Sequence, residues 1–566
     1  MSLSQYSSTV NTENQIGISQ KILAITPLAM VLGISPWQTM DSINLPKFLI
    51  LVIAAAGLLT LTVFDKKSSI LNSVPKSSIM IFVGFMISLT LTLITSGAPL
   101  IQQLYGVNGR NTGFITYVSL SVIWLLAIAH SQEILITKVI RNTILSGQIT
   151  ATYCLLQYFG ADPINWNNPY SPILGFLGNP NFVSAFLGIS SVAAITVVID
   201  RQAKSIQRMV CAIQIVLSLA LIILSNSQQG LLVIASGFVV LAAMRIYSMK
   251  NRLLLISFLS ATVTGSVGAI LGMLKIGPLS SILYQDSITF RGDYWRAAIH
   301  MASEKPLFGI GLDSYGDWYR RARDLEATVR RGPDVVSNAA HNVYLDMLAN
   351  GGFALFAIYC ASTILVVLSI FKVLRSGKSP NSSYLAVIAC WVAFQIQSII
   401  SINQLGLVIW GWIFGGLIIG GAFNAKSKKR VSTSESDSMN PAQVVKVFAG
   451  VLIGLIIAVP PFYASAKFKS ALETRNANAI YLAAKLFPLD PVKLVSASTI
   501  FIENKMPNQA VELANISRTN FPSDFQTLRI ISTSEYFDDK ERESAKRLMR
   551  ELDPKNDSLK TDLLSP

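Results

Sequence analysis

Histidine and arginine are the residue types in the stretch 277–342 that could carry out group-transfer chemistry. His341 lies directly before a long apolar run and one residue before Asn342. An imidazole at such a position can act as a general base near neutral pH. The same stretch is rich in arginine, whose planar guanidinium group suits bidentate binding of phosphate oxygens. Arginines beside a membrane surface therefore predict binding of a lipid-linked phosphate or diphosphate.

The same residues also have structural interpretations, which the sequence leaves open. A lone histidine can pack in a core, and an arginine can belong to a solvated or ion-paired helix face. The stretch holds eight basic and eight acidic residues. The net charge of the stretch therefore does not indicate phosphate binding. Its preference for arginine over lysine does.

Metal, cofactor and nucleotide chemistry find no support in the sequence. Clusters of His and Cys at metal-ligand spacing are absent, and so are Asp-x-Asp pairs. Walker loops and Rossmann glycine signatures are absent as well. The four cysteines all fall in apolar runs, where they are expected to be small core residues: Cys154, Cys211, Cys360 and Cys390. We expect neither a metal nor a cofactor.

The elements that must position this chemistry are apolar helices. Of the 566 residues, 51% are hydrophobic and 14% charged, and the mean hydropathy is +0.50. These values exclude a disordered chain and argue against a single soluble globule. Segments of the length that crosses a bilayer recur along the sequence. They predict an all-α, polytopic membrane protein with about 12–13 spans: 22–37, 48–64, 79–95, 114–129, 139–159, 182–199, 209–224, 231–247, 253–274, 343–371, 384–401, 407–423 and 444–463.

The net charge of +15 is best explained as a topology signal rather than as a nucleic-acid footprint. The cations gather in one set of alternate loops, and the short loops of the opposite set hold few cations beyond Lys47 and Arg110. By the positive-inside rule the N-terminus is cytoplasmic, and the long loop and the tail are external. The cations lie in alternate loops: Lys66, Lys67, Lys76, Lys138, Arg141, Arg201, Lys204, Arg208, Arg245, Lys250, Arg252, Lys372, Arg375, Lys378, Lys426, Lys428, Lys429 and Arg430.

The tail has a mixed charge and helix-period apolar residues. Its Phe-Pro-x-Asp motif at 487–490 recurs at 521–524, 34 positions later, with an echo at 552–556. The spacing resembles a short tetratricopeptide array, and a plain helical domain is the alternative. Four parts follow: an N-terminal membrane bundle, an external catalytic loop, C-terminal membrane helices and an external helical tail, at residues 1–276, 277–342, 343–463 and 464–566.

Several motifs together resemble the superfamily of O-antigen ligases, O-antigen polymerases and bacterial O-oligosaccharyltransferases. The main ones are Arg291…Tyr294-Trp295…Met301…Pro306-Leu-Phe-Gly-Ile-Gly-Leu312 and His341-Asn342-Val-Tyr-Leu345…Gly351-Gly352. Supporting matches are Gly109-Arg-Asn-Thr-Gly113, Gly178-Asn-Pro-Asn181 and Ser225-Asn-Ser-Gln-Gln-Gly230. The resemblance covers residues 22–423.

The resemblance implies a metal-independent glycosyltransferase of the bacterial cytoplasmic membrane, acting at its external face. The donor would be a glycan on a polyprenyl diphosphate, usually undecaprenyl. The acceptor would be a hydroxyl of a glycan, a lipid-linked sugar or a protein. His341 matches the family's essential histidine and Arg291 its loop arginine, so both are catalytic candidates. The substrate-binding candidates are Arg110, Arg296, Arg320, Arg323, Asn342 and Tyr294.

One departure from the family pattern affects the donor site. Family members often carry an arginine at the position of Gln228 or Gln229. Either a neighbour such as Arg320 or Arg323 supplies that charge, or the donor is bound differently. Two other functions stay open: a transporter or flippase of lipid-linked sugars, and a non-catalytic envelope scaffold. The tail's helices suggest a protein partner or protein acceptor.

Overall fold

A computed structural model describes residues 17–63, 73–166, 171–376, 381–424 and 441–559. Over these residues all regular secondary structure is helical, which confirms the predicted all-α class. Ten helices in the described ranges are long and apolar enough to cross a membrane. The protein is therefore a multi-pass membrane protein.

Each predicted apolar segment is occupied by a helix. The ten long apolar helices are α3 (Asn44–Val63), α4 (Lys76–Thr95), α8 (Pro180–Ile199), α9 (Ser205–Leu224), α10 (Gln229–Ser248), α11 (Arg252–Met273), α16 (Val343–Leu374), α17 (Ser382–Ile400), α18 (Leu405–Asn424) and α19 (Pro441–Glu473). Two others are apolar but shorter: α2 (Ile18–Leu32) and α6 (Phe114–Ala129). The remaining one, α7 (Glu133–Tyr158), is long but contains Arg141, Asn142 and Gln148. These three helices explain why the predicted 12–13 spans exceed ten.

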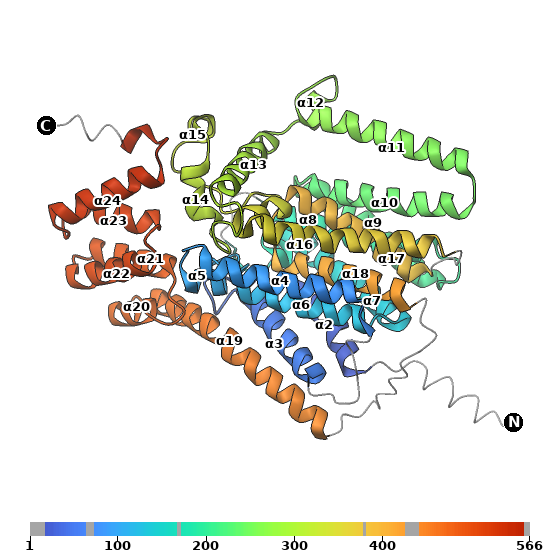
Figure 1. Cartoon of the computed structure of the whole chain (residues 1–566), viewed down its shortest axis with the longest axis horizontal. Helices are drawn as coiled ribbons and strands as arrows, with labels where there is room; N and C mark the ends of the chain where they lie inside the picture. Colours follow the sequence, from blue (N-terminus) through green and yellow to red (C-terminus); the bar gives the residue numbers. More distant parts are fainter. Residues whose placement is uncertain (1–16, 64–72, 167–170, 377–380, 425–440, 560–566) are drawn as a thin grey trace.

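Helix α18 lies at the centre of the bundle, and α11 lies at its edge (Figure 1). Most of α18 is buried, and Trp410 and Phe414 are fully enclosed by neighbouring helices. In contrast, the apolar span of α11 has none of its residues buried, and its main contacts are with α10 and α12 (Ser280–Leu283). Because exposed apolar surface of this extent is unstable in water, α11 must face lipid.

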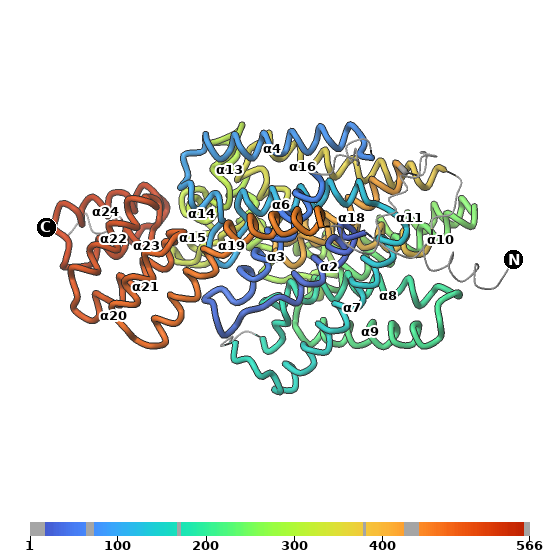
Figure 2. Tube along the Cα trace, turned by 90° about the horizontal axis from the view of Figure 1, so that it is seen from below, coloured from blue at the N-terminus to red at the C-terminus, as the bar shows by residue number. Residues whose placement is uncertain are grey.

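The long loop and the tail lie at one end of the bundle, called the site end from here on (Figures 1 and 2). The loop contains three helices besides α12: α13 (Asp286–Glu304), α14 (Tyr315–Ala322) and α15 (Leu325–Arg331). Short helices α5 (Leu100–Tyr105) and η2 (Gly175–Leu177) also lie in turns. Successive bundle helices reverse direction, so the turns after α6, α8, α10 and α16 share the opposite, far end (Figure 1). Lys and Arg side chains lie in or near these turns. Outside the described residues are Lys66, Lys67, Lys378, Lys426, Lys428, Lys429 and Arg430.

A break in α16 holds the long loop against the bundle. At Gly352 the backbone leaves the helical conformation, with φ +65°. The freed amide of Phe353 donates to the carbonyl of Pro306 at 2.7 Å, and that of Ala354 donates to Leu307. A Cβ at position 352 would press into the Leu307 carbonyl group. Glycine is therefore required, because a side chain would prevent this close backbone pairing.

The tail consists of helix pairs that continue from α19. Its helices are α20 (Ala477–Ala484), α21 (Pro491–Glu503), α22 (Pro507–Asn520), α23 (Phe525–Thr533), α24 (Asp539–Leu552) and η3 (Asp557–Leu559). The aspartates of the repeated motif, Asp490 and Asp524, cap the N-termini of α21 and α23. The repeat thus marks the start of successive helix pairs, and its tetratricopeptide character stays a prediction. The predicted domain boundary at 463 falls inside α19, and the four-part division is likewise untested.

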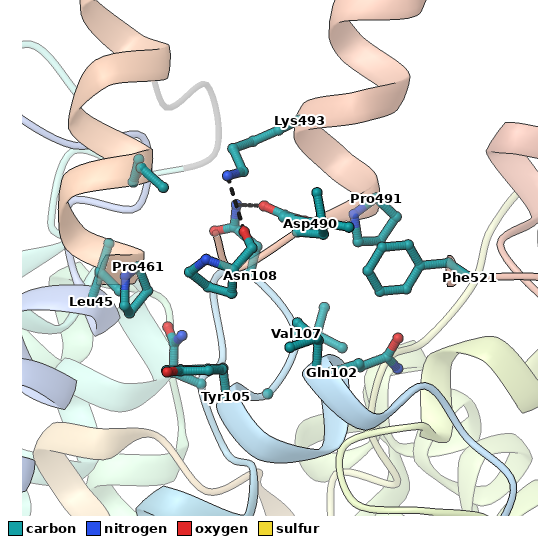
Figure 3. Close-up of a pocket in the computed structure, with 17 residues that line it drawn as sticks. Leu45, Gln102, Tyr105, Val107, Asn108, Pro461, Asp490, Pro491, Lys493 and Phe521 are labelled. Atoms are coloured by element: carbon teal, nitrogen blue, oxygen red, sulfur yellow. Dashed lines mark hydrogen bonds between the residues drawn. The ribbon is translucent and has the colours of Figure 1, made fainter. Parts of the chain in front are cut away.

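The first joint between tail and bundle lies at the turn after α5 (Figure 3). Asn108 donates from Nδ2 to Oδ2 of Asp490 at 2.8 Å, and the rings of Tyr105 and Phe487 meet edge to face. Lys493 donates to the carbonyl oxygen of Pro488. The cavity enclosed there is about 70 Å³. Because its polar groups bond to one another, this joint serves to fix the tail.

The second joint is an ion cluster between the tail and the long loop. Asp553 accepts from Arg323 at 2.8 Å and from Arg320 at 3.1 Å, and all three side chains are at most 5% exposed. The Arg320 guanidinium also lies over the Phe525 ring, 4.0 Å from its centroid. Both arginines donate to the carbonyl of Pro333. Asp553 therefore holds the chain segment that leads from α15 to His341.

We expect Asp553→Ala to release the tail from the long loop. Two buried guanidinium groups would lose their carboxylate, and breaking a buried ion pair costs roughly 3–5 kcal/mol. Thermal unfolding in detergent should shift down, and limited proteolysis should cut near the end of α24 first. Glu551→Ala, at an exposed neighbouring position, is the control. Equal behaviour of the two variants would show that the ion cluster does not hold the tail.

Candidate functional site

His341 occupies a constrained position where the long loop enters α16. Its φ of +51° lies in the left-handed region, which costs a non-glycine residue energy and is often associated with functional sites. On one side, the Ala340 amide donates to Oδ1 of Asp346 at 2.8 Å. On the other, Oδ1 of Asn342 caps α16 by accepting from two backbone amides. The backbone on both sides of His341 is thus fixed.

The imidazole packs on α13. Its ring stacks on that of Tyr294, with 5.1 Å between centroids and 29° between planes. The Tyr294 hydroxyl accepts a hydrogen bond from Arg331, whose guanidinium also lies over the Phe290 ring at 4.3 Å. This contact brings the end of α15 beside α13 and places Arg331 next to the histidine.

Arg291 lies one helical turn before Tyr294 and meets two other elements. Its Nε donates to the carbonyl oxygen of Ile400 at 3.0 Å, at the end of α17. Nε2 of Gln229, the first residue of α10, donates to the same carbonyl at 3.3 Å. The Ser-rich turn therefore contacts the same carbonyl group as Arg291. Oε1 of Gln229 is buried and bonds to none of the described residues.

Arg110 is built into the site's framework. Its Nε lies 3.0 Å from Oδ1 of Asp313, and both side chains are buried. The other Asp313 oxygen accepts from the Val107 amide at 2.8 Å. Arg110 also donates to the carbonyl of Asn338, three residues before His341. It therefore ties the turn before α6 to the loop that carries the histidine.

The other predicted substrate-binding arginines bond to acids elsewhere. Arg296 is half-exposed and pairs with Asp293 at 2.6 Å and Asp324 at 2.7 Å. Arg320 and Arg323 are buried in the joint with the tail. A further loop arginine, Arg330, also pairs with Asp293. The structure therefore gathers His341, Tyr294, Asn342, Arg291 and Arg110, and it engages the remaining three predicted arginines in ion pairs.

Two guanidinium groups near the histidine lack a carboxylate. Within the described ranges, neither Arg291 nor Arg331 forms an ion pair, whereas every other arginine between α11 and α16 does. Burial lowers the pKa of Arg291. Burial, followed by the positive charges of Arg291, Arg110 and Arg331, lowers the pKa of His341 to about 3. A neutral imidazole thus lies among cations that can accept an anionic ligand.

Metal ligands are not gathered at this site. Across the part of the chain that the structure describes, no group of three or more His, Cys, Asp or Glu side chains could hold a metal ion. The chemistry available here is proton acceptance by an imidazole and anion binding by guanidinium groups.

Comparison with known proteins identifies a family over part of the chain. Residues 213–360 match the protein family described as O-antigen ligase. This stretch is an O-antigen ligase family domain. It contains the Ser-rich turn, α13 with Arg291, His341 and the Gly351-Gly352 break, whereas the motifs at 109–113 and 178–181 lie outside it. The protein is therefore a multi-pass membrane protein that contains an O-antigen ligase family domain. No curated protein matches the chain.

Sequence reasoning did not single out four residues that shape this site. Arg331 was one of several loop arginines with nothing to distinguish it, and Asp313 was counted only in the loop's charge. Asp346 lies five positions after His341, and its carboxylate turns back to the backbone before the histidine. Gln229 was noted only because family members often carry an arginine at that position or at the one before it. No local sequence pattern distinguishes Arg331, because its aromatic partners are 37 and more residues away.

Arg110 and Arg331 should differ in their effects on stability. Arg110→Gln leaves the buried Asp313 carboxylate without its cation, a loss of roughly 3–5 kcal/mol. Arg331→Gln removes a ring contact and one hydrogen bond from a partly exposed group, a loss of about 1 kcal/mol. Thermal unfolding of both variants in one detergent measures the difference. Equal shifts in the midpoint would contradict the assignment of Arg110 to the framework.

Proposed function

We propose that the protein transfers a glycan from a polyprenyl diphosphate to an acceptor hydroxyl. The observation that carries the proposal is the neutral His341 held beside Arg291 and Arg331, two guanidinium groups with no carboxylate partner among the described residues. A diphosphate is the ligand that two such guanidinium groups bind well. The O-antigen ligase family domain, which contains all three residues, supports the same reaction class.

In this reaction the acceptor oxygen attacks the anomeric carbon of the donor sugar. His341 takes the acceptor's proton as the new carbon–oxygen bond forms. The bond from the anomeric carbon to the diphosphate breaks, and the diphosphate leaves with the electron pair. Arg291 and Arg331 stabilise the charge that develops on its oxygens. The imidazolium then returns its proton to solvent or to the departing phosphate.

The donor itself would make His341 a stronger base. In the free protein three arginines disfavour a proton on the imidazole. A bound diphosphate offsets their charge, so the imidazole's proton affinity rises only when the donor is in place. Arg331 is then the candidate for the guanidinium that the family carries in the Ser-rich turn, and Gln229 would bind the donor through its free Oε1.

The same proposal includes the predicted topology. The positive-inside rule assigns the cation-bearing far end to the cytoplasm and the site end to the external face of a bacterial cytoplasmic membrane. The polyprenyl chain would lie among the lipid-facing spans, and the reaction would need no metal. The acceptor is a glycan, a lipid-linked sugar or a protein, with the tail as a possible contact for a protein partner.

The central test uses purified protein, a polyprenyl-diphosphate glycan and candidate acceptors. We expect His341→Ala to lower transfer by about 10²–10⁴-fold, since it removes the base. Arg291→Ala and Arg331→Gln should each lower it by roughly 10²–10³-fold, since each removes charge stabilisation from the leaving group. Product is measured by mass spectrometry. The controls are His300→Ala and Arg321→Ala, whose side chains are about half exposed on the same loop.

Other outcomes would replace the proposal. Normal transfer by folded His341→Ala and Arg291→Ala proteins would remove these residues from the mechanism. Movement of labelled donor across proteoliposomes without product would indicate a flippase. Loss of all activity on deletion of the tail, with loop variants fully active, would indicate a scaffold.

The pH dependence should reflect the depressed pKa of His341. A group whose folded-state pKa is about 3 stays neutral throughout the range from pH 7.5 to 5.5. The value of kcat/KM at limiting donor, which reports the free enzyme, should therefore show no decline with a midpoint near 6.5. A decline at that midpoint, absent in a His341→Gln protein with residual activity, would contradict the neutral, cation-surrounded imidazole.

A further inference from the structure

A large cavity borders the described spans at the far end, away from the catalytic candidates. It has a volume of about 840 Å³ and opens between the base of α11 and the ends of α8, α10, α16 and α17. Its walls are apolar and include Leu241, Met244 and Leu385. Figure 1 shows the turn from α10 to α11 at the end opposite α13. A cavity of this size matches those that hold small molecules or lipid groups.

The mouth of this cavity is cationic. Arg245, Lys250 and Arg252 line it together with Tyr247. Within the described residues, none of the three cations forms an ion pair with a carboxylate. Exposed, unpaired guanidinium and ammonium groups in one cluster attract anions. The cluster therefore provides charge that nothing within the described fold neutralises.

Helix termini add to the positive potential at this mouth. The 22-residue α11 begins at Arg252, and the 19-residue α17 begins at Ser382, which also lines the cavity. The N-terminus of a helix carries a partial positive charge. The two helix termini and the three cations therefore all contribute positive potential at the mouth of the cavity. An apolar cavity with a positive mouth is complementary to a molecule with an anionic head and hydrocarbon chains.

We propose that this cavity is a binding site for an anionic phospholipid of the surrounding membrane. The headgroup phosphate contacts Arg245, Lys250 and Arg252, and an acyl chain occupies the apolar space beside α11. Free phosphate lacks the apolar part that the cavity walls require. Basic pockets between membrane helices are known to bind anionic headgroups. The exposed α11 is then stabilised by a specific lipid as well as by the bulk bilayer.

The site is separate from the proposed glycosyl transfer. No residue of its cationic mouth touches His341, Arg291 or Arg331, which lie at the site end. The two proposals can therefore fail independently. Loss of lipid binding leaves the transferase assignment intact, and loss of transfer in His341→Ala leaves lipid binding intact.

The experiment uses the purified full-length protein in a neutral detergent. Phosphatidylglycerol, phosphatidylcholine and inorganic phosphate are titrated separately, and binding is read by native mass spectrometry and by the thermal unfolding midpoint. We expect phosphatidylglycerol to bind and to raise the midpoint, because a ligand that binds only the folded state stabilises it. Phosphatidylcholine and inorganic phosphate should do neither. Binding should weaken as ionic strength rises.

A matched pair of triple variants tests the residues. Arg245→Gln with Lys250→Gln and Arg252→Gln should weaken phosphatidylglycerol binding by roughly 100-fold. The control replaces three cations that do not line the cavity with Gln: Arg201 and Lys204 in the turn between α8 and α9, and Arg208 in the first turn of α9. It should bind as the unchanged protein does. Equal affinity for phosphatidylcholine, salt-independent binding by the unchanged protein, or equal weakening in both triple variants would overturn the proposal.

Discussion

The backbone pairing at the break in α16 is the constraint on which the site depends. A loop of more than sixty residues could take many orientations relative to the membrane helix that follows it. Here the amides freed at Gly352 donate to carbonyls of the loop, so residues 306–311 run directly against the helix. Buried amides need partners, and only glycine permits the two backbones to approach so closely. The pairing thus fixes α13 relative to the start of α16, and with it Tyr294 relative to His341.

Some buried cations of this framework are held by protein groups, whereas others can bind an anionic ligand. Lys47 is fully buried and donates to three backbone carbonyls, and Arg110 is neutralised by Asp313. The tail neutralises Arg320 and Arg323 through a single aspartate. Arg291 and Arg331 remain beside His341, and neither has a carboxylate partner in the part of the chain that the structure describes. A site that must bind an anion needs such a surplus, because a carboxylate already in place would compete with the ligand.

The tail shows how one sequence motif takes on two structural roles. Asp490 and Asp524 cap the helices that follow them. Asp553, in the echo of the motif at 552–556, accepts instead from two arginines of the loop. Those arginines hold the carbonyls that precede His341. A domain more than 120 residues further along the chain thereby becomes part of the support for the catalytic candidate.

The sequence by itself determined the helical class and the positions of the apolar helices, because hydropathy is a local property. Its motifs also proposed His341 and Arg291 as catalytic candidates. It also indicated the tail's helix pairs through the repeated Asp caps. It could not decide which of eight basic loop residues are available to a ligand, because an arginine's role depends on whether an acid from a distant segment reaches it. Only the tertiary structure placed Asp553 on Arg320 and Arg323 and Asp313 on Arg110, and left Arg331 without a carboxylate among the described residues. The helices α2 and α6 are apolar but short, and the long α7 contains polar residues, so whether each crosses the membrane is similarly ambiguous in sequence.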